Sequence, residues 1–262
     1  MAETARDDRL TIIAIAAIAC VLQDVLHEGF GHGLTAWLSG AHSIIMSTVA
    51  LQSDIDTRLI SANGTLVNLL FAAIFWLLLR RAANYRPATR YFLILALMGN
   101  LFTGTGYFLF SGVMDFGDWA AVIRGLGPHW AWRVALVVIG AASYWASMLL
   151  VGAEMQGFRE KDGGVRRILG LCYTPYFTDG ILAFLGGLMN PLGFFYVIAS
   201  ALPSTLGANA GLLSLPFVMR AWKTEHEDPS GPIRRSPAWI TAGAVAILLF
   251  IFVLGRGVSW SR

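Results

Sequence analysis

Seven stretches of the sequence carry almost no charged side chain, and they constrain the fold more than any other feature. Each is long enough to cross a hydrocarbon core about 30 Å thick as a helix, which pairs its backbone polar groups internally. With 56% hydrophobic and only 13% charged residues, the 262-residue chain is not expected to form a soluble domain. We predict an all-α polytopic membrane protein with about seven transmembrane helices, at residues 10–38, 61–79, 91–110, 131–151, 168–188, 192–216 and 238–254.

Prolines and basic residues refine this prediction. Pro175, Pro191, Pro203 and Pro216 fall in or beside the later stretches, where kinked or broken helices are expected. The arginines of the loops gather in three connections that alternate with loops poor in Lys and Arg. The positive-inside rule then places the N-terminus in the cytoplasm and the C-terminus outside.

The charge and the cysteines also limit the compartment and the partners. The net charge of +3 comes mostly from these loop arginines, so it indicates membrane topology and no nucleic-acid partner. Cys20 and Cys172 lie in predicted spans, where we interpret them as packing residues and not as a disulfide or a metal site. We expect an integral protein of a bacterial inner (cytoplasmic) membrane, with the lipid bilayer as its surroundings.

The first stretch holds four ionisable residues within nine positions, Asp24, His27, Glu28 and His32. Such groups are costly inside a membrane and usually face the bundle interior at a functional site. A zinc peptidase needs two neutral imidazoles on one ion, a carboxylate that takes a proton from water, and a third ligand from elsewhere. Residues 27–32, which read His-Glu-Gly-Phe-Gly-His, offer the first two of these.

The spacing of the two histidines leaves two alternatives. Five residues at about 100° each separate His27 and His32 by roughly 140° on a regular helix, a poor geometry for one ion. Gly29 and Gly31 could instead allow a π-bulge that brings the imidazoles together. If the helix stays regular, Asp24, Glu28 and His32 share one stripe and favour a carboxylate-rich metal site or a proton relay.

Residues 27–40 resemble the site-2 protease family of intramembrane zinc metallopeptidases, apart from one inserted residue. The longer His-Glu-x-x-Gly-His form resembles the motif of a soluble dipeptidyl-peptidase family that binds zinc. The stretch Asn63-Gly64-Thr65-Leu66-Val67-Asn68 is similar to the Gly-Pro-x-x-Asn pattern of the site-2 protease family, with Thr65 in place of Pro.

This resemblance implies a third ligand, an Asp some ninety residues beyond the first His. Asp118 lies at about that separation and is expected on the same side of the membrane as the motif. Asp179, in an Asp-Gly dipeptide, and Asp115 are the alternative third ligands. Asn68 and Asn100 are candidate substrate-binding residues, although an Asn in a membrane helix is as often a cap or a packing group.

Together these features predict a zinc-dependent membrane endopeptidase with one zinc ion held by His27, His32 and Asp118 and with Glu28 as the catalytic base. Its substrate would be a transmembrane or membrane-proximal segment of another membrane protein. The resemblance implies one transmembrane domain, 1–262, with a cytoplasmic segment 1–9, a six-helix-type metalloprotease core at about 10–152 and additional helices at about 168–254. Two alternatives stay open: an inactive accessory or assembly subunit of a membrane complex with an unknown partner, and a proton or metal transporter built on Asp24, Glu28 and His32.

Overall fold

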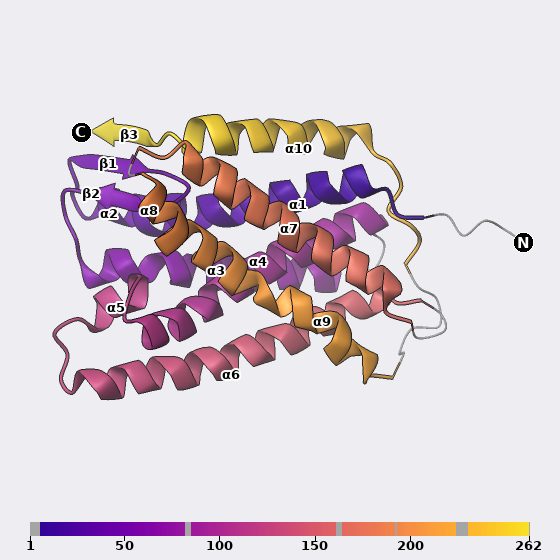
Figure 1. Ribbon diagram of the computed structural model, residues 1–262, viewed down its shortest axis with the longest axis horizontal. Coiled ribbons are helices and arrows are strands. Elements are labelled where there is room, and N and C mark those ends of the chain that lie inside the picture. The colour runs from indigo at the N-terminus through magenta and orange to yellow at the C-terminus, as the bar shows by residue number, and fades with distance from the viewer. Residues whose placement is uncertain (1–5, 82–84, 161–163, 192, 224–229, 262) are drawn as a thin grey trace, which may run out of the picture.

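The computed structural model describes residues 6–81, 85–160, 164–191, 193–223 and 230–261. Long helices lie roughly alongside one another, and a small sheet covers one end of the bundle (Figure 1). Residues 1–5 of the expected N-terminal segment and residue 192 at the start of the expected sixth stretch lie outside the described residues. The elements are α1 (Arg9–Asp24), η1 (Val25–Gly33), α2 (Leu34–Leu38), β1 (Ser43–Met46), β2 (Leu51–Ser53), α3 (Arg58–Arg81), α4 (Pro87–Met114), α5 (Asp118–Ile123), α6 (His129–Met155), η2 (Gln156–Phe158), α7 (Arg166–Leu188), α8 (Phe194–Tyr196), η3 (Val197–Ala201), η4 (Pro203–Gly207), η5 (Ala208–Ala210), α9 (Gly211–Arg220), α10 (Pro237–Leu249), η6 (Phe250–Leu254) and β3 (Val258–Ser261).

Six helices of the described chain are long and apolar enough to cross a membrane, so the protein is a helical membrane protein. They are Arg9–Leu38, Arg58–Arg81, Pro87–Met114, His129–Phe158, Arg166–Leu188 and Pro237–Leu254. Only 11% of the most apolar window of the last helix is buried within the protein, so its apolar side chains face outward, as they do toward lipid. The α4 helix is the opposite case, with 67% of its window buried, and it forms the centre of the bundle.

The expected span at 192–216 differs from the other six because no single long helix forms there. The chain passes instead through α8, η3, η4, η5 and α9, with Pro203 at the start of η4 and Pro216 inside α9. Proline lacks the N–H that continues a helical ladder, which accounts for the irregular backbone that was expected here. This segment still runs from the sheet end of the bundle back to the other end (Figure 1).

Ion pairs fasten the end of the bundle opposite the sheet, where the chain begins. The Arg167 guanidinium binds the Asp7 carboxylate through two nitrogens, at 2.8 and 2.9 Å, and donates to the Ser230 carbonyl at 2.7 Å. Arg90 binds Glu154 at 3.3 Å. The basic residues expected on one side of the membrane therefore meet at one end of the molecule.

A three-stranded antiparallel sheet of order β2-β1-β3 lies at the other end of the bundle. In β1, Ile44 is opposite Ser53 of β2 and opposite Trp260 of β3. Ile44 and Trp260 pack with Ala36 and Ile60, so the sheet is anchored on α2 and the start of α3. The sheet was not expected from the sequence, and it brings residues more than 200 positions apart beside the motif.

Candidate metal centre

The first membrane helix changes its backbone at the motif. Residues Val25–Gly33 form a π-helix between the α-helical segments α1 and α2. Its i→i+5 turn places residues five apart on one face, as an α-helix does with residues four apart. Of the two alternatives that the sequence left open, the structure has the bulge and not the regular helix with a stripe of Asp24, Glu28 and His32.

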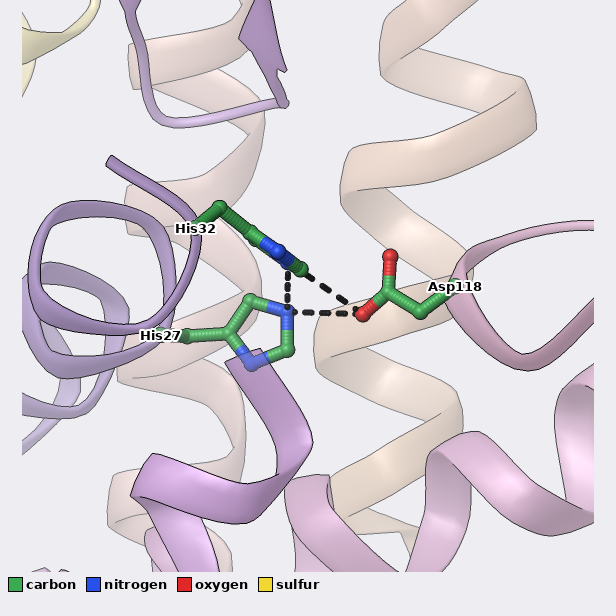
Figure 2. Close-up of side chains that lie close together, drawn as sticks. All are labelled: His27, His32 and Asp118. Atoms are coloured by element: carbon green, nitrogen blue, oxygen red, sulfur yellow. Dashed lines mark hydrogen bonds and ion pairs between the residues drawn. The ribbon is translucent and has the colours of Figure 1, made fainter. Parts of the chain in front are cut away.

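The bulge directs both imidazoles inward and the residue between the glycines outward. His27 and His32 are 3% and 6% exposed, whereas Phe30 is 51% exposed. The two rings are nearly perpendicular, with centroids 4.7 Å apart, and their Nε2 atoms are 3.2 Å apart (Figure 2).

A chain of hydrogen bonds from a backbone carbonyl fixes the tautomer of His27. The Asn100 amide nitrogen donates to the Ala96 carbonyl at 2.8 Å, so the Asn100 oxygen faces Asn68 and accepts from its amide nitrogen at 2.8 Å. The Asn68 oxygen is thereby turned toward His27 Nδ1, at 2.6 Å, and it can only accept. His27 Nδ1 must therefore carry the proton. In the neutral ring, the Nε2 nitrogen then has a lone pair that can bind a metal ion.

The same reasoning holds for His32. Its Nδ1 lies 2.7 Å from the Ile60 carbonyl oxygen, which is also an acceptor only. The Nδ1 atom therefore donates, and the Nε2 lone pair faces the Nε2 lone pair of His27.

Asp118 reaches this point from a short helix that follows α4. Asp115 has a left-handed backbone with φ of 52°, and Gly117 has φ of 84°, so the chain turns sharply before α5 begins at Asp118. The Trp119 indole nitrogen donates to the Thr65 hydroxyl of α3 at 3.0 Å and holds α5 against α3. Asp118 Oδ2 then lies 3.2 Å from His27 Nε2 and 3.3 Å from His32 Nε2 (Figure 2).

Three potential ligand atoms thus converge, and their spacing matches a metal site. Tetrahedral zinc with metal–ligand bonds of about 2.0–2.1 Å requires ligands about 3.3–3.4 Å apart, and the three distances here are 3.2, 3.2 and 3.3 Å. A single shared proton cannot complete all three contacts between two lone pairs and a carboxylate oxygen, but a cation at their centre can. His27, His32 and Asp118 form a group that could hold one metal ion.

The electrostatic state of Asp118 agrees with this donor set. Burial by itself raises the pKa of its carboxyl, and a positive charge at the histidine pair with hydrogen bonds from the two rings lowers that pKa below its ordinary value. With both rings neutral, a metal cation between them would supply that positive charge. Asp118 is therefore a carboxylate, the form that binds metal ions.

Two glycines create the space for the histidine pair. A Cβ on Gly31 would overlap the backbone of Gly64, so the π-helix and α3 come into backbone contact at this point. A Cβ on Gly64 would overlap the imidazoles of both His32 and His27. Gly64 was noted in the sequence only as part of a motif, and its role here is to leave room for the rings.

Glu28 and two of the potential ligands face one cavity of about 440 Å³. Glu28 is 7% exposed, and its Oε2 has no hydrogen-bond partner among the described residues. His32 and Asp118 line the same cavity, and β2 forms part of its wall. A carboxylate with an unpaired oxygen therefore shares a hollow with the potential metal ligands.

The two alternative third ligands are not part of the cluster. Asp179 is buried in α7 and accepts from the Asn209 amide at 3.1 Å. Asp115 pairs with His129 at 3.0 Å and with Arg133 at 3.6 Å, and the hydrogen bond from His129 lowers the pKa of its carboxyl. Of the three candidate third ligands, Asp118 is the one that lies with His27 and His32.

The interpretation of Asn68 and Asn100 as substrate-binding residues also needs correction. Both are fully buried and line none of the cavities described here. Their side-chain amides belong to the series of hydrogen bonds that orients His27. They therefore hold a potential metal ligand in place and do not face a substrate.

Tyr107 of α4 is a site residue that the sequence did not indicate. Its ring stacks on the His27 imidazole, with centroids 4.8 Å apart and planes 21° apart. It also lines the cavity that holds Glu28. The polar and glycine-rich run before it was the sole local signal, and that run is common in membrane helices.

Comparison of the chain with protein-family models, with curated proteins and with solved structures finds no match. The functional interpretation therefore rests on the geometry of the metal centre.

Proposed function

We propose that this protein is a membrane-embedded zinc endopeptidase of the site-2 protease type that hydrolyses peptide bonds in or near transmembrane segments of other membrane proteins. The observation that carries the proposal is the convergence of His27 Nε2, His32 Nε2 and Asp118 Oδ2 at tetrahedral spacing, with both Nδ1 protons committed elsewhere. Two histidines and one carboxylate leave a fourth position open, which is the pattern of catalytic zinc sites.

Zinc at this position would supply Lewis acidity and lower the pKa of water toward about 7. Glu28 takes the proton of the attacking water, because it lines the shared cavity and one of its carboxylate oxygens has no hydrogen-bond partner among the described residues. It then delivers this proton to the leaving amine, so that each hydrolysis restores its carboxylate. Asn68 and the Ile60 carbonyl keep the two imidazoles in the tautomer that presents Nε2.

The position of Glu28 favours the peptidase over an inactive accessory subunit. A metal that only stabilises the fold needs its ligands but no free carboxylate in an open cavity, and structural zinc sites are closed by four protein ligands. Here Glu28, His32 and Asp118 all face a hollow large enough for a small peptide segment.

The topology belongs to the same proposal. We place the chain in a bacterial inner membrane with seven passes, the irregular segment 194–220 being the sixth, with the N-terminus in the cytoplasm and the C-terminus outside. The start of α1 and the strand β3 lie at opposite ends of the molecule (Figure 1), in agreement with an odd number of passes between them. The metal centre then lies toward the outer face, and the substrate helix must unwind there before its amides can react.

Metal content and cleavage of the purified protein in lipid nanodiscs test the proposal. We expect one zinc per chain, lost in His27→Ala, His32→Ala and Asp118→Ala and retained in Glu28→Gln and Asp115→Asn. A library of transmembrane-segment peptides, analysed by mass spectrometry, should be cleaved by the wild type and not by Glu28→Gln. Absence of bound metal in the wild-type protein would contradict the proposal. Cleavage that persists in Glu28→Gln would show that Glu28 is not the base.

A further inference from the structure

A second cavity, of about 370 Å³, adjoins the cavity of the metal centre. It lies between α4, α6 and the irregular segment at 203–210, and its wall is almost entirely apolar. Tyr107, Phe110 and Ser204 line both cavities. The two hollows are therefore neighbours that share one wall, and Tyr107 in that wall stacks on His27.

Small residues on both sides create this space. Gly106 of α4 faces Ala208, and a Cβ on Gly106 would lie 3.6 Å from the Ala208 Cα and 3.7 Å from the Tyr144 ring. Gly207 and Ala210 continue the small wall and are exposed, so the cavity reaches the molecular surface there.

Tyr144 closes the back of the cavity without adding a polar group to it. Its hydroxyl donates to the Ala208 carbonyl and accepts from the Gly211 amide at 2.8 Å. Both polar functions of the hydroxyl are thus used by the backbone of 208–211, and the ring offers an apolar surface. This also holds the irregular segment at a fixed distance from α6, which keeps the space open.

We propose that this cavity is a specificity subsite that binds a large apolar side chain of the substrate, from a residue next to the bond cleaved at the metal centre. The proposal rests on the peptidase function proposed above. The shared wall allows a peptide in the metal-centre cavity to extend a neighbouring side chain across Tyr107 and Phe110 into the apolar cavity.

The volume of the cavity indicates that it binds one side chain of the substrate and not a whole helix. One turn of helix, with a diameter of about 10 Å and a pitch of about 5.4 Å, fills roughly 400 Å³, so a cavity of about 370 Å³ suits a side chain better than a membrane-spanning helix of several turns. A Leu, Met or Phe side chain fits with room for a neighbour. In a pocket of this kind one missing methylene costs about 10–200-fold in kcat/KM, so Ala should be disfavoured at least that much relative to Leu or Phe.

Peptides that differ at one position test this subsite. A series with Ala, Leu or Phe at each position flanking the cleaved bond should show a kcat/KM at least about tenfold higher for Leu or Phe at one of them. Gly106→Leu fills the cavity from α4, and Ala210→Phe fills it from the opposite wall if Gly106→Leu does not fold. Either variant should abolish this preference, keep one zinc per chain and leave preferences at other positions unchanged.

Gly170→Leu is the matched control, because Gly170 is exposed in α7 with open space at its Cβ position. It should keep the wild-type preference. Equal kcat/KM for all peptides in the wild type, or a preference that survives in both filled variants, would overturn the subsite while the peptidase function stands.

Binding to the Glu28→Gln variant separates the subsite from the reaction. Fluorescence anisotropy of labelled peptides should show tighter binding of the Phe peptide than of the Ala peptide, and adding Gly106→Leu should remove the difference. If this difference is found but the wild type cleaves nothing, the proposed function fails, and the cavity stands only as a binding site for an apolar peptide side chain. Equal peptide affinities, together with bound phospholipid that Gly106→Leu displaces, would assign the cavity to an acyl chain and overturn the proposal.

Discussion

At the scale of single residues, two acceptors outside the metal centre decide how its histidines are presented. The Asn68 oxygen and the Ile60 carbonyl each hold one Nδ1 proton, and neither can donate in return. The orientation of Asn68 depends in turn on Asn100 and the Ala96 carbonyl. Groups that orient a metal ligand in this way fix its tautomer, and their loss typically costs about 10–100-fold in metal affinity.

Replacing Asn68 should therefore weaken metal binding without removing a ligand. In Asn68→Leu the His27 ring loses the partner that fixes its tautomer, and we expect zinc affinity to fall by about 10–100-fold. Competition with a chelator measures this loss. Asn209→Leu is the control, since Asn209 is equally buried but pairs with Asp179; a similar loss in both variants would mean that the effect is one of general stability.

Gly64 gives a second prediction at this scale. In Gly64→Ala the added methyl group overlaps both imidazoles, so they must separate and the zinc content should fall well below one per chain. The helical circular dichroism should stay at the wild-type level, because Ala favours helix more than Gly. Gly170→Ala, where the methyl group meets open space, should bind zinc normally. Full zinc occupancy in Gly64→Ala would contradict the close approach of α3 and the rings.

At the scale of elements, the π-helix η1 places the histidines, and its close contact with α3 holds it in position. Gly31→Ala would press a methyl group against the Gly64 backbone and push the two helices apart, so metal content and cleavage should both be lost. Phe30, the neighbouring residue, is exposed on the outer side of the bulge. Phe30→Ala should therefore keep one zinc per chain, and elemental analysis of the two variants side by side tests the direction of the bulge.

The turn into the sheet predicts a pH dependence. The Asp54 carboxylate accepts from the backbone amides of His42 and Ser43 at 3.0–3.2 Å. The Ser43 hydrogen bond in particular lowers the pKa of Asp54 below its ordinary value of 3.8. A lowered pKa in the folded state contributes stability that is fully present above pH 3.8 and is lost as the pH falls through the lower folded-state value.

Hydrogen–deuterium exchange, corrected for its intrinsic pH dependence, should thus show β1 and β2 losing protection below about pH 3.8. Asp54→Asn should lack this acid-induced change and show weaker protection at neutral pH. The same acid-induced change in Asp54→Asn would assign it to another group.

The elements also show what the sequence could predict and what it could not. The six long helices followed from uncharged runs, whereas the bulge was one of two alternatives that the histidine spacing left open. The sheet was missed because β1 pairs with β3 across more than 200 residues, and strands of three or four residues carry little local pattern. The roles of Asn68 and Asn100 were misread because a buried amide looks the same in sequence whether it faces a substrate or a histidine.

At the scale of the whole molecule, the metal centre and the Asp7–Arg167 and Arg90–Glu154 ion pairs lie at opposite ends. The metal centre is at the sheet end, whereas the Asp7–Arg167 and Arg90–Glu154 pairs are at the end where the chain begins (Figure 1). The positive-inside rule assigns the basic end to the cytoplasm. A metal centre toward the outer face would then act on substrate segments that emerge on the side away from the cytoplasm.

Cysteine labelling in intact bacterial cells tests this arrangement. Cys20 and Cys172 are buried and unpaired, so a background with both changed to Ser leaves no native thiol. Thr57→Cys, exposed beside the sheet, should react with a membrane-impermeant maleimide in intact cells, whereas Arg235→Cys should react only after permeabilisation. The reverse labelling pattern would mean that the protein has the opposite orientation in the membrane and that cleavage takes place on the cytoplasmic side. The metal centre and its ligands would be unchanged by that result, because their geometry depends on contacts within the bundle and not on its orientation.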